Sequence, residues 1–282
     1  MAVHINGLGE SLGDSLAISP GGPVYQDIRQ AWYVNSVTGS DSYDGRSSKM
    51  PLATLSQAQT NATAGDIVVL MSGHAETFTS TLTISKTLVI VGGGSSSGLP
   101  TVKLTNNQND SVMFTISGNY VELRNVWIEE ESHASGNNVA GIDVTGTGTR
   151  IRGCYFQLDG KSADGAGLRL SMATGEFCDV TSTTFISTAS AASSVPGTGI
   201  ENAGDGILRM DGVVFDGGTV GFLKGYGFSE SNSSTGLDFL AADNISLLRG
   251  ADMNVHDSTL GFVQVSTDSD EPRIDWTDTG PA

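Results

Sequence analysis

A six-residue pattern recurs along the chain and constrains its fold more than any other feature. It reads apolar, any, small or polar, any, any, apolar. Copies span residues 123–128, 151–156, 180–185 and 210–215, with a weaker copy at 255–260. Successive copies begin 28, 29, 30 and 45 residues apart. A period of this length is typical of solenoids, in which each repeat stacks on the one before it.

Each copy predicts two short strands separated by a single bend residue. The bends fall at Asn125, Gly153, Ser182, Gly212 and Asp257, residue types that tolerate left-handed or bridge dihedral angles. A third short strand is expected between copies, at 112–116, 141–144, 167–170 and 199–202. Three strands per turn predict an all-β fold, a single-stranded right-handed parallel β-helix whose turns stack at about 4.8 Å. A β-sandwich with coincidentally similar strands is the alternative.

The rest of the chain divides around this solenoid. Residues 1–31 are Gly-rich and aperiodic and predict an N-terminal arm, residues 32–265 the β-helix domain, and residues 266–282 an acidic C-terminal tail that leaves the solenoid. Thr54 and Gln57 form a capping-box pair and Gly65 is a natural stop, which predicts a capping helix at about 54–64. The longest spacing predicts an inserted loop over 225–236.

Composition excludes several classes of function. The net charge is −17 with a pI near 4.3, and no basic stripe is visible, so no nucleic-acid partner is expected. No apolar run approaches the ~18 residues of a membrane span, so no membrane insertion is expected. The first ten residues lack the basic and apolar regions of a signal peptide. Cys154 and Cys178 fall in different columns of the repeat, which predicts two free thiols, and no cofactor is expected.

Residues 32–94 resemble a known family. Trp32-Tyr33-Val34-Asn35 is followed by Gly39-Ser40-Asp41, Asp44-Gly45, Pro51-Leu52-Ala53-Thr54 and Gly65-Asp66-Ile67-Val68-Val69. This order resembles the N-terminal part of pectate-lyase-like right-handed parallel β-helix proteins, common among phage tailspikes, other virion proteins and bacterial surface proteins. The resemblance implies the fold, but the same fold hosts lyases, hydrolases, adhesins and inert spikes.

The catalytic motifs of two enzyme classes in that family are missing. The chain has neither the Asn-Thr-Asp, Asp-Asp and Gly-His-Gly set of polygalacturonases nor the Arg-x-Pro-x-x-Arg element of pectate lyases. Glycosidases of the tailspike type place carboxylates on loops without a shared motif. For an enzyme, the catalytic candidates are Glu131 and Asp159, which the repeat places one turn apart. A solvated acidic face explains the same two residues.

Metal binding has only weak candidates. Asp41 and Asp44 lie in an oxygen-rich turn that suits Ca²⁺, although Asp side chains that bond their own backbone explain the turn equally. The four histidines (4, 74, 133 and 256) are scattered and are expected at surface or turn positions.

Together these features predict a phage virion structural protein, and more readily a non-enzyme than an enzyme. The expected protein is a surface projection, whether a capsid decoration protein, a head fibre or a short tail spike. It would be a homotrimer made in the host cytoplasm without a signal peptide, attached to capsid or tail proteins on the virion surface. Contact with host polysaccharide is left open. A polysaccharide lyase or glycoside hydrolase of the tailspike type is the alternative, and a bacterial surface adhesin the third interpretation.

Overall fold

The protein is described from a computed structural model. The described residues are 30–108, 111–130, 140–158, 166–188, 198–204, 206–218, 226–230, 239–248, 252–256, 260–267 and 274–277. The predicted arm therefore lies outside the described residues apart from its last two positions.

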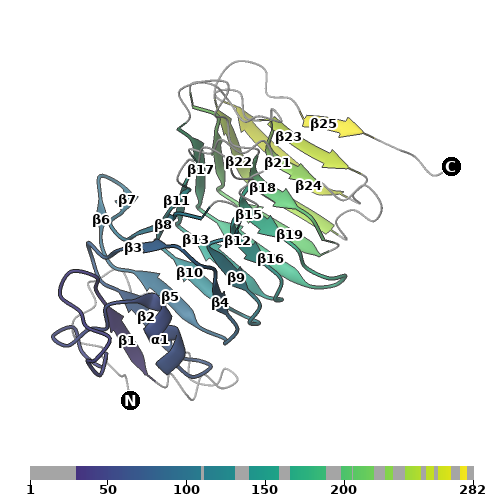
Figure 1. The fold of residues 1–282 in the computed structure, drawn as a ribbon. Helices are drawn as coiled ribbons and strands as arrows, with labels where there is room; N and C mark the ends of the chain where they lie inside the picture. Colours follow the sequence, from purple (N-terminus) through teal and green to yellow (C-terminus); the bar gives the residue numbers. More distant parts are fainter. Residues whose placement is uncertain are drawn as a thin grey trace, which may run out of the picture.

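The fold is an all-β parallel solenoid with one short helix, as the repeat predicts (Figure 1). Three columns of parallel strands run along it, and we call one pass through the three columns a rung. The first column is β1 (Ala31–Val34), β2 (Ile67–Leu70), β5 (Val89–Gly92), β10 (Glu122–Arg124), β13 (Thr149–Arg152), β16 (Phe177–Thr181), β19 (Ile207–Asp211) and β22 (Phe239–Leu248).

The second and third columns complete each rung. The second column is β3 (Ala75–Phe78), β8 (Lys103–Asn106), β11 (Trp127–Glu130), β14 (Tyr155–Leu158), β17 (Thr184–Ser187) and β20 (Val214–Asp216), which pairs with the end of β22. The third column is β4 (Leu82–Ile84), β9 (Phe114–Ile116), β12 (Ala140–Val144), β15 (Ala166–Leu170), β18 (Thr198–Asn202), β21 (Tyr226–Glu230), β23 (Asp252–His256) and β25 (Ile274–Thr277). β6 (Ser95–Ser96) and β7 (Leu99–Pro100) form an antiparallel hairpin, and β24 (Leu260–Thr267) pairs with β22.

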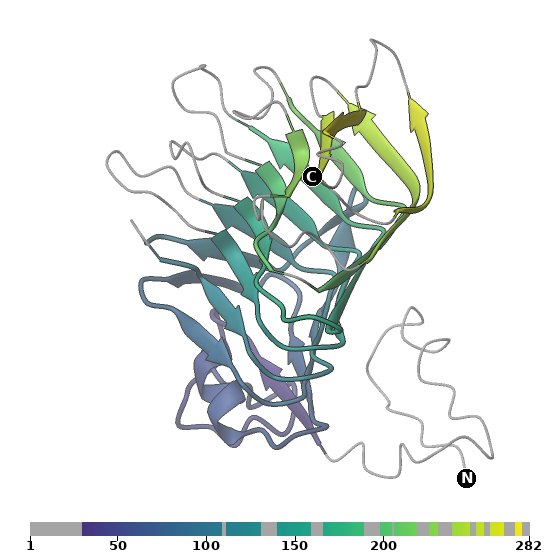
Figure 2. The ribbon, with the colours of Figure 1, turned by 90° about the vertical axis from the view of Figure 1, so that its right-hand side faces the viewer.

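The bend between the first and second columns is a single left-handed residue, which confirms the prediction. Its φ is +52° at Asn125, +58° at Gly153, +49° at Ser182 and +62° at Gly212. One residue in this conformation turns the chain sharply, so the two flanking strands lie on different faces of the solenoid (Figure 2). The Asn125 side chain also holds the bend, since its Nδ2 donates to the carbonyl oxygens of Gly92 and Gly94.

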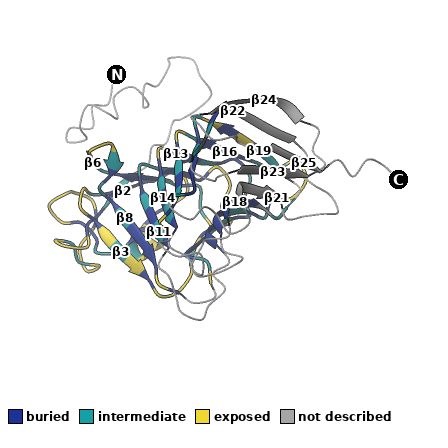
Figure 3. Ribbon diagram, turned by 90° about the horizontal axis from the view of Figure 1, so that it is seen from above, coloured by how far each residue is buried: buried dark blue, intermediate teal, exposed yellow. Residues whose placement is uncertain are grey.

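The inward residues of successive rungs stack in register and form one core. Leu123, Ile151, Val180 and Met210 occupy one position of the first column. In the second column Ile128 aligns with three phenylalanines, which stack with ring centroids 4.5 Å and 5.4 Å apart. These phenylalanines are Phe156, Phe185 and Phe215, all fully buried. Figure 3 shows buried and partly exposed positions along the second column, with exposed segments on its edge strand β3.

The predicted fifth copy of the repeat, Val255–Leu260, is wrong. The register pairs Met210 with Ala242 and Phe215 with Leu247, so the next copy is 242–247, 32 residues after the fourth. Val255 lies on β23 in the third column instead. A small alanine at the first apolar position hid the true copy. The predicted inserted loop is also wrong in part, because residues 226–230 form β21.

The helix α1 (Leu55–Asn61) covers the N-terminal end of the solenoid beside β1 and β2, as predicted (Figure 1). The Thr54 side chain caps it by accepting from the Gln57 N–H at 3.1 Å. Leu55, Ala58 and Ala62 form its buried face. The helix stops at Asn61, before Gly65. No helix in the described ranges is long and apolar enough to cross a membrane.

The strands continue past the predicted end of the β-helix domain at residue 265. β24 runs to Thr267, and β25 pairs in parallel with β23 within the expected tail.

The bend predicts a stability change that depends on the backbone alone. Nothing lies within 4 Å of a Cβ added at Gly153, so the Cβ of a substituted residue meets no clash. The left-handed backbone still costs a branched L-residue about 1–2 kcal/mol or more, and we expect the free energy of unfolding in urea to fall by that amount. Thr184→Val is the control, because Thr184 is a half-buried outward residue of β17 on the next rung. It should change the free energy of unfolding by less than about 0.5 kcal/mol. Equal stability of Gly153→Val and wild type would contradict this account of the bend.

Candidate functional site

The two catalytic candidates from the sequence, Glu131 and Asp159, lie outside the described residues. Each directly follows the end of a described strand, β11 and β14, whose last residues Glu130 and Leu158 are register partners. Their assignment to neighbouring rungs remains a prediction.

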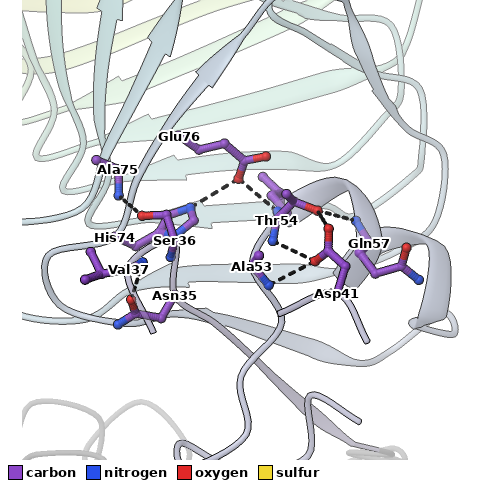
Figure 4. A network of polar contacts seen from close by, with 11 residues as sticks. Asn35, Ser36, Val37, Asp41, Ala53, Thr54, Gln57, His74, Ala75 and Glu76 are labelled. Atoms are coloured by element: carbon purple, nitrogen blue, oxygen red, sulfur yellow. Dashed lines mark hydrogen bonds and ion pairs between the residues drawn. The ribbon is translucent and has the colours of Figure 1, made fainter. Parts of the chain in front are cut away.

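The weak metal candidates both make hydrogen bonds to the chain itself. Asp41 Oδ1 accepts from the N–H groups of Ala53 and Thr54 at 2.9 and 3.0 Å, and its Oδ2 accepts from Thr54 Oγ1 at 3.0 Å (Figure 4). Asp44 Oδ1 accepts from the Arg46 N–H at 3.0 Å. Asp41 thus holds the start of α1, and Asp44 closes a local turn. Within the described ranges, no three His, Cys, Asp or Glu side chains group together as metal ligands would.

A buried histidine ties the same end of the solenoid together. His74 Nδ1 accepts from the Ser36 N–H at 3.0 Å, so the ring proton sits on Nε2 and faces Glu76 Oε2 at 3.2 Å (Figure 4). The same Glu76 oxygen accepts from the Leu55 N–H, at the first residue of α1. His74 closes a turn, as expected, and its side chain is fully buried.

The outer surface of the second column carries a cluster that sequence reasoning missed. Trp127 and Tyr155 occupy the same outward position on neighbouring rungs, with ring centroids 5.3 Å apart at 77°. Lys103 precedes them in that row and places its Nζ 5.2 Å from the Trp127 ring centroid. We call the outward side chains of these three strands the aromatic face: Lys103, Thr105, Trp127, Glu129, Tyr155 and Gln157.

Glu129 fixes the polar side chains of the aromatic face. Its Oε1 lies 2.6 Å from Lys103 Nζ and accepts from Gln157 Nε2 at 3.4 Å. Its Oε2 accepts from Thr105 Oγ1 at 3.1 Å. The carboxylate is 14% exposed, and its partners come from the rungs on either side. The face is therefore held rigidly across three strands.

A second row of polar residues lies on the outside of the third column. Thr115, Asp143, Arg169 and Glu201 are successive register partners. Arg169 Nε lies 3.3 Å from Glu201 Oε2, and Ser171 Oγ donates to Asp143 Oδ1 at 2.7 Å. Two carboxylates thus flank one arginine, separated by two strand spacings, or about 9.6 Å at the backbone.

The outer wall of the first column is a ladder of ion pairs, which the sequence reading also missed. Glu122 Oε1 lies 2.6 Å from Arg124 Nε and 3.3 Å from Arg152 Nε. Two rungs on, the carboxylate of Asp179 lies 3.7 Å from Arg150 and 3.5 Å from Arg209. A signal was present in the sequence, because charges of opposite sign follow one another at the repeat spacing.

One carboxyl group lies inside the solenoid, at the corner where the second column ends. Burial raises the pKa of Glu130 to about 8, against a smaller lowering by the side-chain hydrogen bond from Asn106. Asn106 Nδ2 lies 3.4 and 3.2 Å from the two carboxyl oxygens. An added Cβ on Gly141 would meet Glu130 Oε1 and lie 2.9 Å from the carbonyl oxygen of Gly167, so this position of β12 favours glycine.

The two cysteines are free and buried, as predicted. Burial raises the pKa of the Cys154 thiol to about 12 and also raises that of Cys178, so both stay protonated at neutral pH. Neither thiol is suited to act as a nucleophile.

Comparison with known proteins finds similar solved structures and shows no function. No protein-family profile and no curated protein matches the sequence. Among solved structures, the chain is similar to a rhamnogalacturonan lyase, with a TM-score of 0.43 and 15% identity over 80% of this chain and 68% of the other. It is also similar to the pectate lyase Pel9A, with a TM-score of 0.35 and 13% identity over 86% of this chain and 79% of the other. The parallel β-helix assigned here rests on the strand pairing of this chain itself.

The pKa of Glu130 predicts a pH-dependent stability. The folded value of about 8 lies above the ordinary 4.5, so the folded state binds the extra proton. This contribution is complete below pH 4.5 and is lost as the pH rises to about 8, at up to roughly 1.4 kcal/mol per pH unit. Glu130→Gln removes the titration, so its unfolding free energy relative to wild type should rise across that window and level off above pH 8.

The control for this prediction comes from the repeat itself. Leu158 occupies the position of Glu130 on the next rung, so Glu130→Leu places an apolar residue in an environment that already accepts one. Both variants should lose the same pH dependence in urea melts between pH 4 and 9. A pH profile for Glu130→Gln parallel to that of wild type would show that Glu130 does not titrate in this range.

Proposed function

We propose that this protein is a structural component of a phage virion, a trimeric β-helix projection that presents its outer faces to the surroundings. The projection is a capsid decoration protein, head fibre or short tail spike, attached to capsid or tail proteins through its terminal segments.

The observation that carries the proposal is the ion-pair ladder on the first column. Glu122 and Asp179 each lie between two arginines, and together these groups join four consecutive rungs, β10, β13, β16 and β19. Asp179 is the register partner of both Arg150 and Arg209, and such pairs of opposite charge stabilise neighbouring strands. Ion pairs that link successive rungs along one wall suit a protein whose solenoid serves to present its outer surfaces. The resemblance of residues 32–94 to virion β-helix proteins supports the same proposal.

A carbohydrate-active enzyme is the second candidate, and one observation favours it. Asp143 and Glu201 lie on one outer face, about 9.6 Å apart at the backbone with Arg169 between them. Inverting glycosidases separate their two carboxyl groups by roughly 6.5–9.5 Å, so these two side chains would have to lean toward each other from their backbone spacing.

The virion proposal predicts a homotrimer that is part of the particle. Light scattering after size exclusion should give about three times the chain mass of 29.2 kDa. Mass spectrometry of gradient-purified particles, encoded by the genome that carries this chain, should find it in fixed stoichiometry to the capsid or tail proteins. Particles that lack the chain would contradict the proposal. A monomer in solution that becomes trimeric on particles would still support it.

Activity assays separate the two candidates. Incubation with host capsule or surface polysaccharide should release no reducing ends and no unsaturated uronate if the protein is structural. Activity lost in Asp143→Asn or Glu201→Gln would instead establish the enzyme on the third column. Activity lost only in Glu131→Gln or Asp159→Asn would place it on the loops.

A further inference from the structure

We propose that the aromatic face is a glycan-binding site that takes a neutral pyranose unit. The inference rests on the proposed function in one respect only: a surface projection has a use for contact with host glycans. The sugar would stack on the rings of Trp127 and Tyr155, and Gln157 and Lys103 would hydrogen-bond its hydroxyl groups.

The first argument is that the face is confined to three strands. On β17 and β20 the row of Trp127 and Tyr155 continues with Thr184 and Val214, and the row of Glu129 and Gln157 continues with Ile186 and Asp216. The solenoid therefore does not need aromatic residues at this outward position. Among the described strands of the column, aromatic rings stand at this outward position on β11 and β14 alone.

The second argument is the arrangement of the rings. At 5.3 Å and 77°, one ring presents its edge to the other. Both side chains are partly exposed. The C–H groups on one face of a pyranose are apolar and carry slight positive charge, which suits the negative face of an aromatic ring. The two rings are close enough to contact a single sugar unit together.

The third argument is that polar groups are fixed at the edge of the rings. Glu129 holds Lys103 and Gln157 on opposite sides, so these side chains lose little freedom when a ligand arrives. Lys103 keeps 38% of its side chain exposed. The packing of Trp127 against Tyr155 would stabilise the sheet even if Lys103, Glu129 and Gln157 were absent, so sheet stability alone does not explain these polar residues. The combination of apolar rings with ordered donors and acceptors is what recognition of a sugar requires.

The charge of the face and of the whole chain selects a neutral sugar. Lys103 is compensated by Glu129 at 2.6 Å, so the face has no net charge. The chain carries −17, which repels polyanionic glycans such as uronates. Neutral hexose or deoxyhexose units are therefore the ligand class.

The experiment measures binding directly with named probes. Saturation-transfer NMR and isothermal titration are run with neutral gluco-, galacto-, manno- and rhamno-oligosaccharides, and with oligogalacturonate as the anionic counterpart. At least one neutral oligosaccharide should bind, with an affinity that hardly changes between low salt and 0.5 M NaCl, whereas an ionic contact would weaken. Binding of oligogalacturonate alone, or of no probe, would overturn the proposal.

Three variants locate the site. Trp127→Ala should weaken binding more than tenfold, and Gln157→Leu, which keeps the side-chain volume, about three- to tenfold. Tyr43→Ala is the matched control, because Tyr43 is an exposed aromatic residue away from the face and its loss should leave binding unchanged. Thermal melts of each variant establish that it is folded. Gln157→Leu keeps the test valid if Trp127→Ala unfolds.

The outcomes also separate this inference from the proposed function. Sugar binding that persists in folded Trp127→Ala and Gln157→Leu variants would overturn the assignment to this face. A folded, particle-bound protein that binds no neutral sugar would overturn the binding site while leaving the virion role intact. Binding at the face by a protein that is absent from particles would overturn the virion role while leaving the binding site intact.

Discussion

Phe156, Phe185 and Phe215 lie on one another at a single inward position, and the rest of the molecule depends on this register. Parallel rungs about 4.8 Å apart bring the same position of each repeat into contact, so an apolar side chain there is buried by its own copies. A slip of one residue would turn every inward side chain outward. The one-residue bends keep the register, because each turns the chain at the same point of the rung.

The same register organises the outer surface. Outward side chains also contact the residues at the same position on neighbouring rungs. Their interaction partners are therefore set by the column in which they lie, not by their neighbours in the sequence. The outer surface of the first column carries alternating charges, and that of the second column carries the aromatic face. The third column carries two carboxylates on either side of Arg169. These three surfaces are consequences of one stacking rule applied to different side chains.

At the ends and corners of the solenoid, residues do not stack on residues of the same kind in the next rung, and other interactions stabilise the chain. At the N-terminal end, α1 covers the apolar column, and Asp41, His74 and Glu76 satisfy the backbone N–H groups at its start and nearby. At the corner after β11, Glu130 occupies a position that holds Leu158 on the next rung. A buried carboxyl group thus stands where the next rung has leucine, and burial raises its pKa.

The sequence by itself determined the solenoid, the bends at Asn125, Gly153, Ser182 and Gly212, the capping helix and the two buried free cysteines. It could do so because a rung repeats its pattern of small bend residues and apolar positions locally in the chain. It misplaced the fifth copy, since Ala242 is too small to stand out as apolar. Only the tertiary structure decided which polar residues meet: Trp127 with Tyr155, Glu129 with Lys103 and Gln157, and Asp179 with Arg150 and Arg209. These partners lie a rung apart in the sequence, and whether their side chains touch depends on register and on which face each residue takes.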